Sequence, residues 1–378
     1  MRYVVLPLFL WGLACGALAR DDPADSPVDA GRHVVTAHTA YAYREVDTTG
    51  YEVWVAPMRL YVHQRRRVTE RVMSAMARVA FWLDADEAAN FRTRTRDIAA
   101  DSESGRRPLI RFHNDPEERI YHVRDRDGEA RRTRLNGVLE GRLTIPSEHA
   151  EQLLAAQDSD DGWLRFTATA GRHQGQGWVQ LLEPEGLSVI SDIDDTVKAT
   201  EIPAGRRTVV RNTFFKDFEA ARGMAELYSQ WEDEAAFHYV SGSPWQLYNS
   251  LTGFLFSREA GFPRGSLHMK TVRKNPFSLN TWRDLSELAT NESVTFDQKL
   301  RQIEQIFQHF PQRRFVLVGD SGERDPEIYR TMQERYPDQV EDIYIRDVVD
   351  DRTYRPERLQ GMTIIPAPTI LHRSLRVD

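Results

Sequence analysis

The order of apolar and polar positions divides the chain into two halves. Between residues 36 and 183, short apolar runs recur at the spacing of strands separated by turns. From Leu187 onward, apolar runs of strand length alternate with segments whose apolar residues repeat at helical spacing. In the first half, strands are predicted at 51–55, 58–62, 109–112, 119–123, 137–145, 163–169 and 177–182.

The predicted fold class is α/β. A parallel sheet with helices on both faces is expected over residues 184–378, and a β-rich, sandwich-like domain over 36–183. In the second half, strands are predicted at 187–190, 237–240, 315–318 and 342–345, and helices at 225–231, 245–259, 295–310 and 326–336.

A helical insertion is predicted inside the first domain, at 68–83 and again at 84–100. Val72, Met76 and Val79 share one side of the first of these helices. Ordinary core packing accounts for its methionines, so we expect that side to face the interior.

The beginning of the chain has the pattern of a secretory signal peptide. An apolar run over 3–13 follows a charged start, and an Ala-x-Ala cleavage site ends at Ala19. The run is shorter than the ~20 apolar residues that a membrane span needs. We therefore predict a signal peptide over 1–19, a flexible tail over 20–35 and export, to a bacterial periplasm.

The single cysteine of the chain, Cys15, lies inside that segment. A cysteine at this place can carry a lipid, so a membrane-anchored lipoprotein is the alternative to a cleaved signal peptide. Gly12 stands where a lipoprotein signal carries a branched apolar residue, which argues for cleavage.

Composition narrows the possible partners. The chain has 378 residues, of which 40% are hydrophobic and 28% charged, as is typical of a globular protein with room for two domains. The net charge of −7 argues against general nucleic-acid binding. The basic run at 65–67 can meet anionic lipid head groups, although a solvated surface is the simpler interpretation. Any membrane contact is expected to be peripheral.

The stretch 191–196, Ser-Asp-Ile-Asp-Asp-Thr, is the most informative part of the chain. Alternate side chains of a strand share a face, so Asp192, Asp194 and Thr196 come together at the carboxyl end of the predicted strand. Two carboxylates this close repel each other, and a divalent cation such as Mg²⁺ holds them ionised. The pattern predicts a phosphoryl-transfer site with an aspartate nucleophile. A plain helix cap or turn is the alternative.

Three further segments support this interpretation. Ser241 follows a short apolar strand and precedes a proline that can open a helix, an arrangement that favours a phosphate oxygen. Asp320 ends another buried strand, and Asp325 lies on the loop beyond it. Lys299 lies near the start of a helical pattern.

In this order, the four segments resemble the signatures of the haloacid dehalogenase superfamily. More narrowly, residues 187–350 are similar to the catalytic domain of the actin-patch-type phosphatidate phosphatase family. The matching strings are SDIDDTVK at 191–198, RNTFF at 211–215, GMAELY at 223–228, YVSGSPWQLY at 239–248 and FVLVGDSGERDPEIY at 315–329. The resemblance implies a haloacid dehalogenase-like fold and a Mg²⁺-dependent phosphatase.

The resemblance also implies roles for single residues. Asp192 corresponds to the nucleophile that forms an aspartyl-phosphate, and Asp194 to the general acid and base. Thr196 orients the loop and helps to hold Asp194. Ser241 binds the transferring phosphoryl group, and Lys299 neutralises the nucleophile and the phosphate.

The implied metal ligands are Asp192, the backbone carbonyl of Asp194, Asp320 and Asp325. Spacing does not decide which of Asp320 and Asp325 binds the metal directly. Two other lysines, Lys270 and Lys274, are alternatives to Lys299, which fits the superfamily spacing better.

The implied substrate is phosphatidate, which would give diacylglycerol. The segment after the nucleophile, 197–223, forms a flap in the superfamily, and here it is both basic and aromatic. It could seat a lipid phosphate, although packing of Phe214 and Phe215 against a helix is the simpler interpretation. A soluble phosphate ester, or a non-catalytic protein that binds phosphate or lipid, remains the alternative. Oligomeric state and the role of the first domain stay open.

Overall fold

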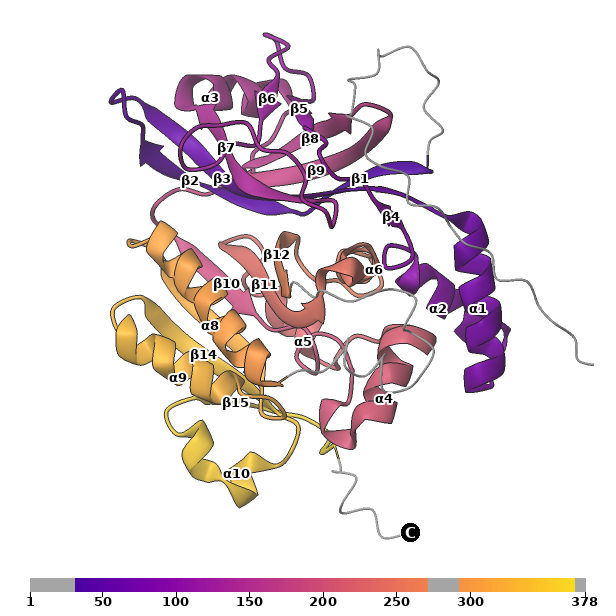
Figure 1. The fold of residues 1–378 in the computed structure, drawn as a ribbon. Coiled ribbons are helices and arrows are strands. Elements are labelled where there is room, and N and C mark those ends of the chain that lie inside the picture. The colour runs from indigo at the N-terminus through magenta and orange to yellow at the C-terminus, as the bar shows by residue number, and fades with distance from the viewer. Residues whose placement is uncertain (1–30, 271–291, 371–378) are drawn as a thin grey trace, which may run out of the picture.

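The structure is a computed structural model that describes residues 31–270 and 292–370 (Figure 1). The predicted signal peptide, Cys15 and Lys274 lie outside these residues, so export and lipidation stay predictions. None of the helices within the described ranges is long and apolar enough to cross a membrane.

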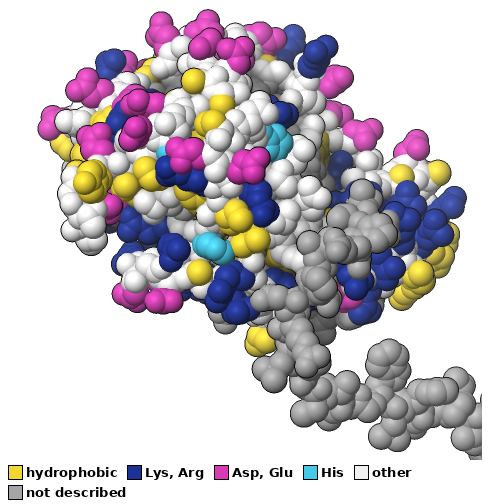
Figure 2. Space-filling view, turned by 90° about the horizontal axis from the view of Figure 1, so that it is seen from above, with side chains coloured by type: hydrophobic (Ala, Val, Ile, Leu, Met, Phe, Trp, Pro, Cys, Tyr) yellow, Lys and Arg dark blue, Asp and Glu magenta, His cyan; other side chains and the backbone are white. Residues whose placement is uncertain are grey.

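The first half forms a nine-stranded sheet in the order β1-β3-β2-β9-β8-β5-β6, with β4 and β7 also paired to β3. Both β1 and β2 bridge β3 and β9, so all nine strands belong to one hydrogen-bonded network, and the sandwich stays a prediction. Figure 2 looks onto this half, where side chains of both charge signs are scattered. The elements are β1 (His33–Ala37), β2 (Ala40–Val46), β3 (Glu52–Gln64), β4 (Asp101–Ser102), β5 (Leu109–Phe112), β6 (Tyr121–His122), β7 (Val138–Pro146), α3 (Ser147–Ala156), β8 (Trp163–Ala170) and β9 (His173–Leu181).

Two helices, α1 (Arg67–Phe81) and α2 (Ala85–Thr95), interrupt this sheet at the predicted place. The start of α2 is fixed by a capping box, in which the Asp84 side chain accepts from the backbone N–H of Glu87 at 2.8 Å. The predicted inward side of α1 is wrong. Met76 is 52% exposed, because the side of α1 that contains Ala77 packs inward instead.

The second half forms a six-stranded sheet in the order β12-β11-β10-β13-β14-β15, with every neighbouring pair parallel. This confirms the predicted α/β class. Its strands are β10 (Leu187–Ser191), β11 (Ala235–Pro244), β12 (Gly265–Lys270), β13 (Arg314–Asp320), β14 (Val340–Asp347) and β15 (Thr363–Pro366). Its helices are η1 (Ile202–Ala204), α4 (Arg206–Val210), η2 (Arg211–Phe215), α5 (Met224–Tyr228), η3 (Trp245–Leu247), α6 (Tyr248–Leu255), α8 (Glu292–His309), α9 (Asp325–Arg335), α10 (Asp351–Tyr354) and η5 (Pro356–Leu359).

Alternate side chains of the parallel strands enter two different cores. In β10, Val189 joins a cluster with α5 and α6, whereas Ile190 joins a cluster with α8 and α9. Each face of the sheet is therefore covered by helices, as the near-continuous apolar runs of the strands require.

The two sheets meet along a polar and aromatic junction. The Tyr41 hydroxyl of β2 lies 2.8 Å from Nδ1 of His309 on α8, and the Tyr41 ring contacts His238 edge-on. Thr39 donates its backbone N–H to the Tyr248 hydroxyl at 2.8 Å. These contacts fix the first half against α6, α8 and β11 of the second half.

Candidate active site

The site lies at the carboxyl edge of the parallel sheet. β10 and β13 pair in parallel with Ser191 opposite Val318, and the backbone N–H of Asp192 continues the ladder to the Val318 carbonyl at 2.9 Å. This register places Asp192 beside the end of β13, where Asp320 stands. Such an edge, where parallel strands end, is where α/β sheets bind ligands.

Three carboxylates converge there. Asp192, Asp320 and Glu323 each place one carboxylate oxygen within 4.8 Å of the others. Asp192 is 1% exposed and Asp320 is fully buried. Oδ1 of Asp320 accepts the backbone N–H groups of Gly322 at 2.6 Å and Glu323 at 3.2 Å. Its Oδ2 is buried and makes no hydrogen bond within the described chain.

This arrangement fits a divalent cation. Carboxylate oxygens that lie this close together are typical ligands of Mg²⁺. The buried Oδ2 atom of Asp320, which makes no hydrogen bond within the described chain, is free to bind such an ion. Burial raises the pKa of Asp320 well above its usual range, and Asp325 and Asp192 raise it further. The described residues therefore leave negative charge at this position uncompensated.

Lys299 enters the site from α8. Its Nζ lies 2.6 Å from Oδ1 of Asp192, 2.9 Å from Asp325 and 3.0 Å from Glu323. Although burial lowers the pKa of Lys299, these carboxylates outweigh it and hold the pKa well above its usual range. Lys270, the alternative from the sequence, ends β12; burial lowers its pKa, and the charge of Glu323 opposes that effect.

Asp325 does not join the three converging carboxylates. Its Oδ1 accepts from Lys299 at 2.9 Å, and its Oδ2 faces the backbone N–H of Asp320 at 3.3 Å. Gly319 makes room for it, since a Cβ there would lie 2.6 Å from the Asp325 Cβ. In this structure Asp325 holds the lysine and the end of β13 in place, and the third converging carboxylate belongs to Glu323. A role for Asp325 in binding the metal stays a prediction.

Asp194 lies in a separate hydrogen-bond network on the same loop. It accepts from Lys198 Nζ at 2.8 Å, Thr200 Oγ1 at 2.7 Å, Ser243 Oγ at 3.0 Å and Ser241 Oγ at 3.4 Å. Burial alone would raise the pKa of Asp194, but the Lys198 ion pair and these hydroxyls lower it to about 2.

Thr196 and Ser241 occupy positions near the predicted ones. The Thr196 hydroxyl donates to Oδ2 of Asp192 at 3.3 Å, so it holds the predicted nucleophile rather than Asp194. Ser241 ends β11 beside Asp194 and also accepts the Ser243 backbone N–H at 2.9 Å.

Asp195 closes the loop behind the site. It has a positive φ of 58°, and its carboxylate accepts the backbone N–H groups of Thr200, Glu201 and Ile202 at 2.6–2.8 Å. The Arg346 guanidinium donates to its carbonyl at 2.7 Å. The segment after the nucleophile is thereby anchored at its root.

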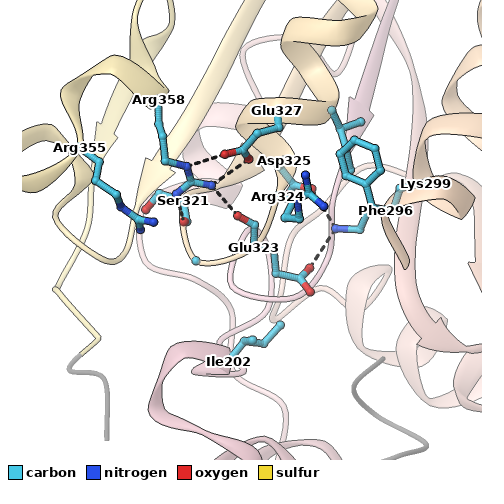
Figure 3. A pocket seen from close by; sticks show the side chains of 12 residues that line it. Ile202, Phe296, Lys299, Ser321, Glu323, Arg324, Asp325, Glu327, Arg355 and Arg358 are labelled. Atoms are coloured by element: carbon cyan, nitrogen blue, oxygen red, sulfur yellow. Dashed lines mark hydrogen bonds and ion pairs between the residues drawn. The ribbon is translucent and has the colours of Figure 1, made fainter. Parts of the chain in front are cut away.

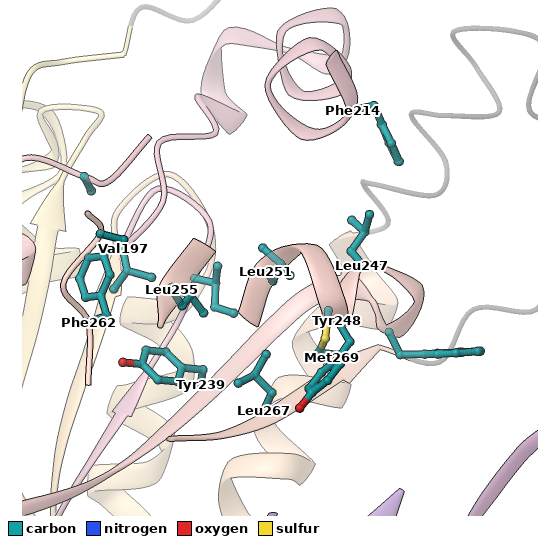
Figure 4. Close-up of a cluster of buried hydrophobic side chains, with 14 of the residues drawn as sticks. Val197, Phe214, Tyr239, Leu247, Tyr248, Leu251, Leu255, Phe262, Leu267 and Met269 are labelled. Atoms are coloured by element: carbon teal, nitrogen blue, oxygen red, sulfur yellow. The ribbon is translucent and has the colours of Figure 1, made fainter. Parts of the chain in front are cut away.

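The flap segment that follows is packed rather than open. Phe214 and Phe215 are fully buried, and Figure 4 shows Phe214 among the side chains of the apolar cluster beside the sheet. Phe215 contacts the rings of Phe81 and Phe91, from α1 and α2. Packing therefore accounts for both phenylalanines, and neither is available to line a lipid tail in this structure.

A pocket of about 360 Å³ opens beside the carboxylates (Figure 3). Lys299 and Glu323 form one wall, and Arg324, Arg355 and Arg358 lie around it. Arg324 is exposed and stacks over Phe296 at 4.2 Å, whereas Arg358 pairs with Glu327 and Asp351. A pocket that combines arginines with an apolar ring suits an anionic group attached to an organic body.

Sequence reasoning missed Glu323, Lys198, Thr200 and Ser243. Glu323 follows Asp320 by three residues inside the string that carried the resemblance, so the acidic spacing alone could have flagged it. Lys198 was harder to identify as a partner of Asp194, since nothing in the sequence shows that the chain turns back onto Asp194.

Comparison with known proteins now bears on this site. Residues 187–347 match the family described as "Phosphatidate phosphatase APP1, catalytic domain". This segment is similar to that catalytic domain. The predicted resemblance of these residues to a phosphatidate phosphatase catalytic domain is confirmed by this match.

Two curated relatives match the same part of the chain. "Phosphatidate phosphatase APP1" of Saccharomyces cerevisiae is 36% identical over 169 residues, which cover 44% of this chain and 26% of the relative. "Uncharacterized protein C29B5.04c" of Schizosaccharomyces pombe is 32% identical over 178 residues, 46% of this chain and 27% of the relative. The matched part is thus about a quarter of the length of either relative.

Among solved structures, a family two carbohydrate esterase from Cellvibrio japonicus aligns over 90% of this chain and 91% of its own, at 10% identity and a TM-score of 0.21. A likeness this weak carries no argument about the fold.

Proposed function

We propose that the protein is a Mg²⁺-dependent phosphatase that hydrolyses phosphatidate through an aspartyl-phosphate on Asp192, in a haloacid dehalogenase-like fold. One observation carries the proposal: Asp192 meets Asp320, Glu323 and Lys299 at the edge of the sheet, inside the segment that matches a phosphatidate phosphatase domain.

Asp192 is suited to attack phosphorus. Lys299 and Thr196 each hold one of its oxygens, and they fix the orientation of the carboxylate. Burial raises the pKa of Asp192, and the lysine opposes that effect. In the first step a carboxylate oxygen bonds to phosphorus, the bond from phosphorus to the alcohol oxygen breaks, and diacylglycerol leaves.

Asp194 is suited to move the protons. The leaving alkoxide takes a proton from Asp194. In the second step Asp194 accepts a proton from a water whose oxygen bonds to phosphorus, while the bond from phosphorus to the Asp192 oxygen breaks, so that phosphate leaves and the Asp192 carboxylate is restored. Its low pKa in the free protein suits the second step. For the first step the carboxyl must be protonated, and the negative charge of a bound phosphate raises its pKa toward that state.

The metal would be held by Asp192, Asp320 and Glu323, with the Asp194 carbonyl as a further ligand from the family resemblance. When bound, Mg²⁺ neutralises charge on the phosphoryl oxygens and on the carboxylates that surround it. Lys299, which contacts Asp192 and Glu323, supplies fixed positive charge beside the same carboxylates.

The substrate part of the proposal draws on the relative's printed name and on the pocket. Arg324 and Phe296 offer a charge and a ring beside Lys299, which suits a phosphate joined to an apolar body. A soluble ester of similar chemistry would also enter, so substrate preference needs a direct comparison.

The test is a panel of phosphatidate in detergent micelles and a soluble aryl phosphate, assayed with Mg²⁺. We expect turnover of phosphatidate, and a loss in Asp192→Asn on the order of 10⁴–10⁶-fold, as for other covalent nucleophiles. Acid quenching should trap a phosphorylated protein from the parent chain and none from Asp192→Asn. The matched control is Asp338→Asn, at an exposed position after α9.

Three outcomes are decisive. If neither ester is hydrolysed, the phosphatase proposal fails, and the alternative of a non-catalytic binding protein is favoured. Full activity in Asp192→Asn removes the assigned nucleophile. Turnover of the aryl phosphate but not of phosphatidate keeps the chemistry and removes the lipid substrate.

A further inference from the structure

Helix α1 exposes an apolar stripe. Val68, Val72, Met76 and Val79 are 76%, 52%, 52% and 79% exposed, and Trp82 at the helix end is 92% exposed. At about 100° per residue these five side chains fall within an arc of about 120° on one side of the helix. They are five of the ten large hydrophobic residues exposed in the described chain, so exposed apolar surface is concentrated here.

The same helix concentrates positive charge. Residues 65–82 contain five arginines and one glutamate, in a chain whose net charge is −7. Arg67, Arg71 and Arg78 are exposed, lie along one edge of the stripe by helical spacing, and form no ion pair with any described residue. Figure 2 shows dark-blue and yellow side chains together at the right-hand edge, on the side where Figure 1 places α1.

Two of the acids near α1 are paired with other arginines, whereas Asp84 and Asp86, at the start of α2, are exposed beyond the end of α1. Glu70 is mostly buried, with 10% of its side chain exposed, and faces Arg96 at 3.9 Å. Asp101 pairs with Arg66, just before α1. Neither carboxylate belongs to the exposed stripe.

The helix is attached to the part of the catalytic domain that follows the nucleophile. α2, which forms a hairpin with α1, donates from Asn90 to the Phe215 carbonyl at 2.9 Å and from Arg94 to the Thr213 carbonyl at 3.0 Å. That segment, 197–223, contains Thr200, whose hydroxyl donates to Asp194 in the site. A surface bound by α1 would therefore lie next to the flap.

We propose that α1 docks the protein on an anionic lipid surface, with its apolar stripe in the head-group boundary and its arginines on lipid phosphates. An apolar face flanked by arginines is the pattern of helices that lie in the membrane interface. A second copy is a poor occupant, since it presents the same three unpaired arginines. The docking surface itself does not depend on the proposed function. Only its purpose does: phosphatidate is a lipid, so a phosphatase that acts on it must reach a lipid surface.

The experiment is vesicle flotation with the full chain, using phosphatidylcholine–phosphatidylglycerol vesicles and vesicles of phosphatidylcholine alone. Neither contains a phosphate monoester, so the active site has no substrate to bind. We expect binding to the anionic vesicles that weakens with salt, and a loss of about ten-fold or more in the double variant Val72→Asp/Val79→Asp. Arg67→Gln/Arg71→Gln/Arg78→Gln should lose about as much on anionic vesicles.

The matched control is Leu135→Asp, which replaces an equally apolar side chain that is 91% exposed and lies off α1. It should bind as the parent does. All proteins share residues 1–66, so any contribution of the apolar run at 3–13 is common to them. Circular dichroism melting checks that each variant is folded, which is expected because the changed side chains are exposed.

Trp82 gives a second measurement. Its emission should shift to the blue on anionic vesicles, and the difference should vanish in Trp82→Phe. No vesicle binding by the parent, or equal binding by the double variant, overturns the proposal. A parent that is dimeric in solution and becomes monomeric in the double variant also overturns it, because a second copy then covers the stripe.

Failure of this proposal and failure of the proposed function can be told apart. The double variant should hydrolyse the soluble aryl phosphate at the parent rate, whereas Asp192→Asn should bind vesicles like the parent. Loss of aryl phosphate hydrolysis with intact vesicle binding would count only against the phosphatase.

Discussion

Buried polar side chains gather in two regions of the molecule, the candidate active site and the junction of the two sheets, and they differ in chemical character. At the carboxyl edge of the parallel sheet, the carboxyl groups of Asp192 and Asp320 are buried close together beside the Lys299 ammonium, and burial raises the pKa of both carboxyls. At the junction of the two sheets, His238 and Tyr41 are buried as neutral rings that contact each other, because burial lowers the histidine pKa and raises the tyrosine pKa.

The two regions show that the buried polar groups that stabilise the fold differ from those that form the candidate active site. Neutral, packed polar groups add to stability, whereas a cluster of buried carboxylates opposes folding unless a ligand compensates it. Strand β11 contributes to both regions, with His238 at the junction and Ser241 at the site. Four experiments test this contrast.

The largest effect is expected from Lys299→Met. Its ammonium contacts Asp192, so its removal takes away fixed charge stabilisation, which should lower kcat by about 10²–10³-fold on a soluble aryl phosphate. Lys270→Met, at the alternative lysine, is the comparison and should lose much less. Equal losses in both variants would show that the choice of lysine is wrong.

Asp320→Asn should lose metal response while gaining stability. The folded state raises the pKa of Asp320, so at neutral pH folding must bury a charge that the unfolded chain exposes to water. Replacing it by the neutral amide should increase the metal-free free energy of unfolding by about 1–3 kcal/mol.

Urea unfolding with and without Mg²⁺ measures both effects. Mg²⁺ should raise the stability of the parent and of Asp338→Asn, and leave Asp320→Asn unchanged. A metal-free Asp320→Asn that is less stable than the parent would contradict the idea that this carboxylate opposes folding.

His238 should make the junction sensitive to acid. Burial lowers its pKa well below the usual value, so the unfolded chain binds a proton that the folded chain excludes. Its contribution to stability is therefore lost as the pH falls below about 6.5, by up to about 2 kcal/mol at pH 5.

The measurement is urea unfolding of the parent and of His238→Gln across this pH range. The glutamine variant should show a flatter dependence, even if its stability at neutral pH is lower. His122→Gln, a less buried histidine of the first sheet, should follow the parent more closely. Parallel curves for the parent and His238→Gln would place the acid sensitivity elsewhere.

The smallest effect is expected from Arg211→Gln. Its ion pair with Glu87, 2.6 Å long, joins the flap to α2, but the arginine side chain is 51% exposed. Exposed pairs contribute about 0–1 kcal/mol, so the thermal midpoint should hardly move. A large drop would show that the hairpin α1–α2 depends on this one contact.

Much of the second half could be predicted from the sequence, because its strands are buried on both faces and read as plain apolar runs. The helix that carries Lys299 and the strand ends at Asp192 and Asp320 followed from those runs and from motif order. Glu323 and Lys198 could not be assigned in the same way, since their positions depend on how a loop folds back on itself.

The first half was harder, and α1 shows why. Helical periodicity finds an apolar side but does not tell whether protein, solvent or another surface faces it. The prediction that Val72, Met76 and Val79 face the interior is wrong, because the side of α1 that contains Ala77 packs inward instead.

Gly319 has a consequence for protein engineering. Its missing side chain leaves the space into which Asp325 and the Tyr329 ring fit, at 2.6 and 2.7 Å from where a Cβ would stand. A saturation library at this codon, selected for turnover, should return glycine alone, while the codon for the exposed Asp338 should tolerate wide replacement.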